Sequence, residues 1–177
     1  MGTIKTTNIE PIADNGTVTL GSSGDTFTLG SGVLQSNMLY PAFLLESNTT
    51  QSIGHASFTK ATNLSEVFDT DNAVSSQRFT VPTGKAGKYI LHGSSSWPGN
   101  ATGQRITSIY KNGSEALRFA SIASSSSNNN AGQTGSGILD LSEGDYLELY
   151  VYQSSGGNLD LQSQSPRTRF GAYRIGS

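Results

Sequence analysis

Two histidines, His55 and His92, are the side chains of this chain that titrate closest to neutral pH. Imidazole groups can bind a metal ion or transfer a proton, but these two lie far apart in the sequence. His92 alternates with Tyr89 and Leu91 along a predicted strand, so it shares the opposite face with Ile90. We expect a structural role for His92, and not metal binding or acid–base catalysis.

Asp69 and Asp71 are the best candidates for a calcium site. They lie close together in a predicted loop, and carboxylates are the hard oxygen ligands that Ca²⁺ prefers. The loop lacks the later glutamate and the glycine of a complete calcium-binding loop. We therefore favour a role in forming and capping the turn, and we expect neither a metal nor a cofactor.

Further carboxylates around a second predicted turn are the candidates for a glycosidase: Asp140, Glu143, Asp145 and Glu148. Glycosidases place a carboxylate pair across the scissile bond, and we expect no deep groove in a small β-sandwich. Serine is abundant, but no Gly-x-Ser-x-Gly motif marks a catalytic nucleophile. We expect a protein that is not an enzyme.

Polar surface loops are candidates for contact with a host cell-surface glycan. An aromatic ring and side-chain amides are groups that sugar-binding sites use, and the loops contain both. The residues are Trp97, Asn100, Asn128, Asn129 and Asn130. The alternative is a solvated loop that binds nothing.

The stretch from Gly137 to Tyr152 is the element around which the other predicted strands are organised. It predicts two strands joined by a tight turn, with alternate aliphatic residues facing a common core. The other face of the second strand carries Tyr146, Tyr150 and Tyr152. Three tyrosines are unusual on a solvated face, so we expect another subunit to cover them.

The composition favours short strands. Hydrophobic residues make up 34% of the chain and charged residues 14%, and glycine, serine, threonine and asparagine are abundant. The net charge of −2 gives no electrostatic footprint for nucleic acid, and no apolar run approaches the roughly 20 residues of a membrane span. The absence of cysteine excludes disulfides, zinc–thiolate sites and thiol nucleophiles.

Residues 37–177 form the predicted head domain. We count about eight to ten short strands there and no helix, and Asn112-Gly113 is a strong hairpin signal. This pattern predicts an all-β fold, a β-sandwich in its jelly-roll form.

Residues 16–36 contain two copies of one short strand pattern. Gly16-Thr17-Val18-Thr19-Leu20-Gly21 is followed by Asp25-Thr26-Phe27-Thr28-Leu29-Gly30. Two such strands cannot bury their apolar face alone, so we expect a threefold intertwined β-stalk that buries Val18, Leu20, Phe27 and Leu29. The alternative is a hairpin packed on the head. Residues 1–15 lack the apolar core of a signal peptide, and we expect them to form an anchor through Ile4, Ile9 and Ile12.

Several motifs resemble the complement-type globular head, a family that shares its trimeric jelly roll with tumour necrosis factor. Phe79-Thr80-Val81-Pro82 followed by Gly87-Lys88-Tyr89-Ile90-Leu91 resembles the family's Phe-x-x-Pro…Gly-x-Tyr-x-Phe signature, with Leu91 in place of the last aromatic residue. Tyr110-Lys111-Asn112-Gly113 is similar to its central hairpin, and the stretch from Gly137 to Asp145 to its leucine and Gly-Asp strands. Phe170-Gly171-Ala172-Tyr173-Arg174-Ile175 resembles its closing strand.

The resemblance implies a homotrimer whose N-termini gather at one end. We expect the subunit contacts of the head to include Ile90, His92, Tyr146, Tyr150 and Tyr152. The repeats of residues 16–36 resemble the short β-structured stalks of bacteriophage fibre or decoration proteins. We therefore expect a structural protein of the virion surface, attached to a capsid or tail protein through its N-terminus. The alternatives are a soluble ligand-binding head and a polysaccharide-degrading tail enzyme.

Overall fold

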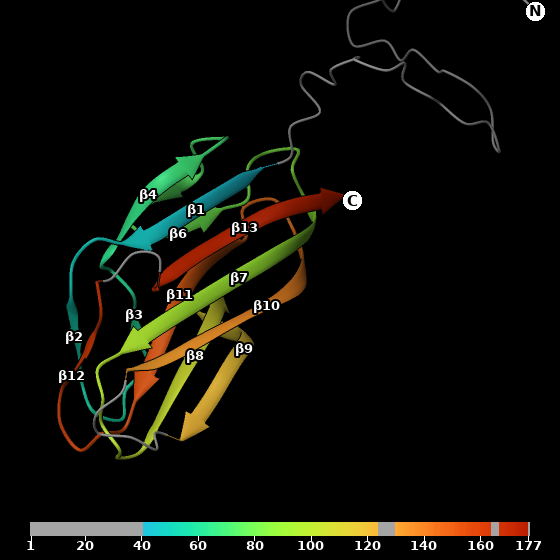
Figure 1. Ribbon diagram of the computed structural model, residues 1–177. Helices are drawn as coiled ribbons and strands as arrows, with labels where there is room; N and C mark the ends of the chain where they lie inside the picture. The colour runs from blue at the N-terminus through green and yellow to red at the C-terminus, as the bar shows by residue number, and fades with distance from the viewer. Residues whose placement is uncertain (1–40, 124–129, 164–166, 177) are drawn as a thin grey trace, which may run out of the picture. The chain divides into compact units, whose positions relative to one another are not determined.

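The computed structural model describes residues 41–123, 130–163 and 167–176. Every regular element among them is a β-strand (Figure 1). The predicted stalk and anchor, with Val18, Leu20, Phe27, Leu29, Ile4, Ile9 and Ile12, lie outside these residues, as do Asn128 and Asn129. No helix in the described ranges has the length and apolarity to span a membrane.

Two antiparallel sheets make up most of the described fold (Figure 1). The first sheet has the order β10-β7-β13-β1-β4, and its strands are β1 (Ala42–Ser47), β4 (Leu64–Asp69), β7 (Gly87–Trp97), β10 (Ala131–Leu141) and β13 (Arg169–Gly176). The second sheet has the order β5-β6-β11-β8-β9, and its strands are β5 (Val74–Ser75), β6 (Arg78–Thr80), β8 (Gln104–Lys111), β9 (Ser114–Ala123) and β11 (Tyr146–Gln153). Three short strands complete the fold: β3 (Thr59–Lys60) pairs with β11, and β2 (Gln51–Ile53) pairs with β12 (Leu159–Leu161).

The core lies between the two sheets and is rich in aromatic side chains. Phe43 of β1 stacks on Phe79 of β6 with ring centroids 4.6 Å apart, which joins one sheet to the other. Phe170 meets Phe43 edge-on, and Tyr89 packs against Phe79. The predicted β-sandwich is confirmed.

β7 has the side-chain alternation that its sequence predicts. Tyr89, Leu91 and Trp97 are fully buried, whereas Ile90 on the opposite face remains 42% exposed. β8 and β9 also form the predicted hairpin at Asn112-Gly113, where both residues have positive φ (52° and 81°). Such angles are those of the type I′ turn that Asn-Gly favours.

The tight turn after Leu141 connects the two sheets and does not close a hairpin. β10 pairs with β7 along its whole length, whereas β11 pairs with β6 and β8. Asp145 closes the turn by accepting a hydrogen bond from the Ser142 amide at 2.7 Å. Both strands still send leucines to the common core, because alternation defines the buried face of a strand but not its partner.

Glycines in the first sheet let the second sheet come close to it. A Cβ on Gly93 of β7 would lie 2.7 Å from the Phe119 ring, and one on Gly135 of β10 would lie 2.5 Å from the Cβ of Phe119. These two glycines are opposite each other in the register of β7 and β10. Phe119 of β9 therefore packs into a space that only glycine leaves open.

We expect Gly135→Ala to lower the free energy of unfolding by about 1–3 kcal/mol, because the added methyl overpacks the contact with Phe119. Gly132→Ala, on the same strand, is the matched control, since nothing lies within 4 Å of its Cβ position. Urea unfolding at one protein concentration measures both variants. Equal stability of the two variants would contradict this account of the close approach.

Candidate functional site

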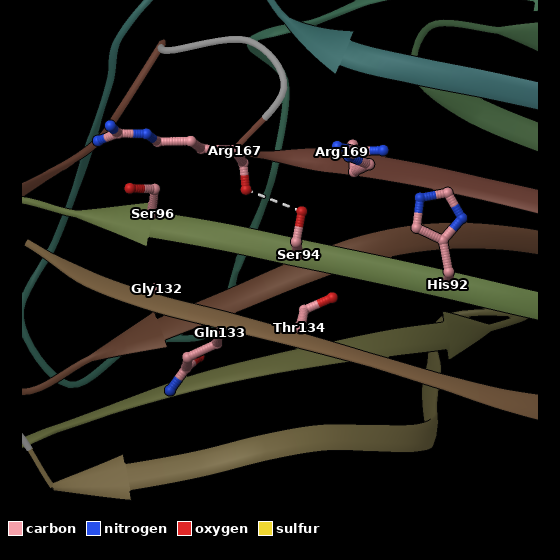
Figure 2. A pocket seen from close by; sticks show the side chains of 8 residues that line it. All are labelled: His92, Ser94, Ser96, Gly132, Gln133, Thr134, Arg167 and Arg169. Atoms are coloured by element: carbon pink, nitrogen blue, oxygen red, sulfur yellow. Dashed lines mark hydrogen bonds between the residues drawn. The ribbon is translucent and has the colours of Figure 1, made fainter.

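A polar pocket of about 430 Å³ lies on the outward face of the first sheet (Figure 2). β7, β10, the start of β13 and the residues just before it supply its walls. Its lining residues are His92, Ser94, Ser96, Gly132, Gln133, Thr134, Arg167 and Arg169. The lining contains two arginines and no carboxylate, although the chain as a whole carries a net charge of −2.

Hydroxyl groups of β7 hold the segment that carries the arginines. Ser94 Oγ donates a hydrogen bond to the Arg167 carbonyl at 2.8 Å, which is the dashed line in Figure 2. The Ser96 amide donates to Thr168 Oγ1 at 3.1 Å, and Ser96 Oγ donates to Gln162 at 3.0 Å. The backbone at Arg167 is thereby fixed beside β7, while the Arg167 side chain remains exposed.

His92 occupies the border of the pocket and rests on a glycine. A Cβ on Gly171 of β13 would lie 2.8 Å from His92 Cε1, so the ring needs the absence of a side chain there. Burial and then the charge of Arg169 lower the pKa of His92, and the charge of Glu46 only partly opposes them. The Nε2 atom is buried without a hydrogen-bond partner among the described residues. A neutral imidazole suits this position.

An apolar row crosses the same outward face next to the pocket. Ile138 of β10 lies opposite Ile90 of β7, which lies opposite Tyr173 of β13. Their exposed fractions are 58%, 42% and 49%. A second cavity of about 280 Å³ adjoins the row, and Leu44, Phe68 and Ala172 contribute to its lining. Ile90 and His92 therefore do share one outward face, as the alternation predicts.

The tyrosine face of β11 is partly covered by the chain's own side chains. Phe58 packs against Tyr152 with ring centroids 5.0 Å apart, and Tyr110 of β8 stacks on Tyr150 at 4.0 Å. The Arg78 guanidinium lies 3.9 Å from the centroid of the Tyr146 ring. Contacts within the chain therefore cover part of this tyrosine face without a second subunit. A subunit contact through the three tyrosines remains a prediction.

Glu148 lies among these tyrosines, and its buried carboxylate forms ion pairs with two partly exposed cations. Its Oε1 accepts hydrogen bonds from Lys60 Nζ at 2.7 Å and from Arg78 Nε at 2.9 Å. Burial disfavours the charged carboxylate, but the bonds from Lys60 and Arg78 outweigh burial and hold the pKa of Glu148 below its usual value. Glu148 thus ties β11 to β3 and β6 and serves as a structural carboxylate.

We expect Glu148→Gln to lower the free energy of unfolding by about 1–3 kcal/mol at neutral pH, because two charge-assisted hydrogen bonds are weakened. A carboxylate with a depressed pKa stabilises the fold above its unfolded-state pKa, and this stabilisation is lost as the pH falls through the folded-state pKa. The difference between Glu148→Gln and the unsubstituted chain should therefore shrink in acid. Denaturant unfolding at neutral and acid pH measures it.

Glu115→Gln is the control for this prediction. Glu115 also bonds an arginine, Arg118, but on the exposed surface of β9. Exposed ion pairs contribute little, so we expect a much smaller loss. If Glu115→Gln lowered the free energy of unfolding as much as Glu148→Gln does, burial would not explain the contribution of Glu148 to stability.

Trp97 is not a surface residue, and its prediction as part of a glycan-binding loop is wrong. It is the last residue of β7, fully buried, and its Nε1 donates a hydrogen bond to Ser95 Oγ at 3.0 Å. The strand continues to the tryptophan, which points inward with Tyr89 and Leu91. Asn100 lies in the following loop, where its side chain accepts a hydrogen bond from the Thr102 amide, and Asn130 is exposed.

Asp69, Glu143 and His55 accept hydrogen bonds from backbone amides. Asp69 accepts hydrogen bonds from the amides of Asp71 and Val74, which is the predicted turn-forming role. Glu143 accepts one from the Gly84 amide, and His55 Nδ1 accepts one from the Gly156 amide. Among the described residues, no group of three or more histidine or acidic side chains is placed to hold a metal ion.

The arginines and hydroxyls of the polar pocket were not predicted from the sequence. Alternation along β7 does place Ser94 and Ser96 on the face of His92, and this signal was available. Arg167 and Arg169 follow a polar loop and show no motif. Only the pairing of β13 with β7, which sets Arg169 opposite Ser94, brings them to the pocket.

Comparison with known proteins identifies the fold. No family model matches the chain, and no curated protein matches its sequence. Murine APRIL at pH 5.0 is similar to this chain with a TM-score of 0.58 and 14% sequence identity, over 77% of this chain and 99% of that chain. Eiger TNF from S. frugiperda has a TM-score of 0.60 and 12% identity, over 78% of this chain and 94% of that chain. The globular domain of zebrafish complement 1qA protein has a TM-score of 0.53 and 17% identity, over 77% of this chain and 98% of that chain. The described head has the jelly-roll fold of these proteins. The predicted fold class of the head is confirmed.

Proposed function

We propose that the chain is a non-enzymatic homotrimeric head whose copies meet through the outward face of the first sheet. The observation that carries this proposal is the apolar row of Ile138, Ile90 and Tyr173, three large side chains in register and about half exposed. Contiguous exposed apolar side chains favour a protein contact. The motifs that resemble the complement-type head support a count of three.

The contact we propose is heterologous: one surface of each copy meets a different surface of the next, and the ring closes after three copies. The cavity of about 280 Å³ beside the row offers a place for an apolar side chain of the neighbour. The neutral His92 fits this position, because a charged imidazole would be costly to bury without a partner. The predicted contacts at Ile90 and His92 belong to this face.

We expect Ile138→Glu to reduce the mass in solution from about 56 kDa, three times the chain mass of 18.6 kDa, toward that of the single chain. The reason is that burying an unpaired charge in an apolar contact is unfavourable. Val67→Glu is the matched control, because Val67 is 55% exposed, against 58% for Ile138, on β4 at the opposite edge of the same sheet. Light scattering measures the mass. Equal masses for the two variants, or a single-chain mass before substitution, would contradict the proposal.

We further propose that the trimer is a structural and attachment protein of a virion surface. The support is the pair of strand patterns in residues 16–36, which resembles the β-structured stalks of bacteriophage fibre and decoration proteins. In this proposal residues 1–15 attach the trimer to a capsid or tail protein, and three weak head contacts act together. Deleting residues 1–15 should leave the trimer intact but abolish its attachment to particles. A soluble ligand-binding head would lose nothing.

A further inference from the structure

The polar pocket combines two guanidinium groups with three hydroxyl groups. Figure 2 shows Arg167 on the side of Ser96 and Arg169 on the side of His92, with Thr134 across from them on β10. Arg169 lies opposite Glu46 in the register of β13 and β1, so part of its charge is balanced on the side away from β10. Arg167 is exposed at the pocket, and acidic residues are absent from the lining. The pocket therefore favours an anion.

We propose that this pocket binds the carboxylate group of an acidic saccharide. A planar guanidinium matches the oxygens of such a group, and Arg167 provides one at the pocket wall. The Thr134 hydroxyl can both donate to and accept from a sugar hydroxyl, whereas Ser94 and Ser96, which donate to Arg167 and Gln162, can accept from one. A volume of about 430 Å³ lies within the usual range of small-ligand pockets.

The position of the pocket separates it from the apolar row. Tyr173 of the row lies opposite Ala42 at the start of β1, whereas Arg169 lies opposite Glu46 near the end of that strand. The two cavities share only His92 and Arg169. Copies that cover the apolar row can therefore leave the polar end of the face open to a ligand.

Every residue that lines the pocket comes from one chain, so the saccharide proposal goes beyond the proposed trimer and does not require it. It also replaces the site predicted at Trp97, which is buried. The saccharide is held by arginine and hydroxyl groups of β7, β10 and the segment that leads into β13, and not by an aromatic ring.

The test is a calorimetric titration of the full chain with sodium glucuronate, with glucose as the neutral probe and inorganic sulfate as the free anion. We expect glucuronate to bind and glucose not to bind at the same concentrations. Arg167→Gln should weaken glucuronate binding about tenfold or more, because a charge-assisted hydrogen bond is lost. Lys88→Gln, which removes an exposed cation from the other end of β7, is the control and should bind normally.

The calorimetric results either support or overturn the saccharide site. Binding of glucuronate that depends on Arg167 supports the proposal, and binding of sulfate alone overturns the saccharide. Binding of glucose as tightly as glucuronate, equal loss in both variants, or no binding also overturns it. Light scattering on the same samples keeps the two proposals apart, because a single chain that binds glucuronate refutes the trimer and supports the pocket.

Discussion

The alternation of side chains along β7 is the constraint on which the rest of the head depends. β7 lies between β10 and β13, so one of its faces must fill the core and the other must face outward. The inward face holds Tyr89, Leu91 and Trp97, which are fully buried. The outward face begins with the exposed Lys88 and then changes from the apolar Ile90 through His92 to the polar Ser94.

That change in polarity connects the fold to the proposed functions. Beside Ile90, neighbouring strands add Ile138 and Tyr173 in register. Burying a large apolar side chain stabilises by about 1.5–3 kcal/mol, so such a row is costly to leave in water. At the polar end, the same neighbours add Thr134 and Arg169. One sheet face thus offers a contact for a second copy and a pocket for an anion.

Local patterns allowed much of the fold to be predicted. The Asn112-Gly113 turn and the alternation in β7 and β11 depend on neighbouring residues alone, and the structure agrees with each. Pairing between distant strands leaves no such pattern. The turn after Leu141 therefore gave no sign that it crosses between sheets.

The sites were harder to predict for the same reason. Trp97 was assigned to a sugar-binding surface because of its aromatic ring, although its place in the alternation with Leu91 already indicated burial. Arg167 reaches the pocket through Ser94, a contact between residues far apart in the sequence. Phe58 covers Tyr152 across a similar gap. No residue pattern of one strand announces these contacts.

The most direct test of the trimer is hydroxyl-radical footprinting of the full chain, with each side chain's rate normalised to its rate in the unfolded chain. If copies cover the outward face of the first sheet, Ile90, Ile138 and Tyr173 are protected while Val67 reacts readily. If the face is open, the three side chains react in keeping with exposed fractions of 42%, 58% and 49%, as Val67 does at 55%. That second result would contradict the account.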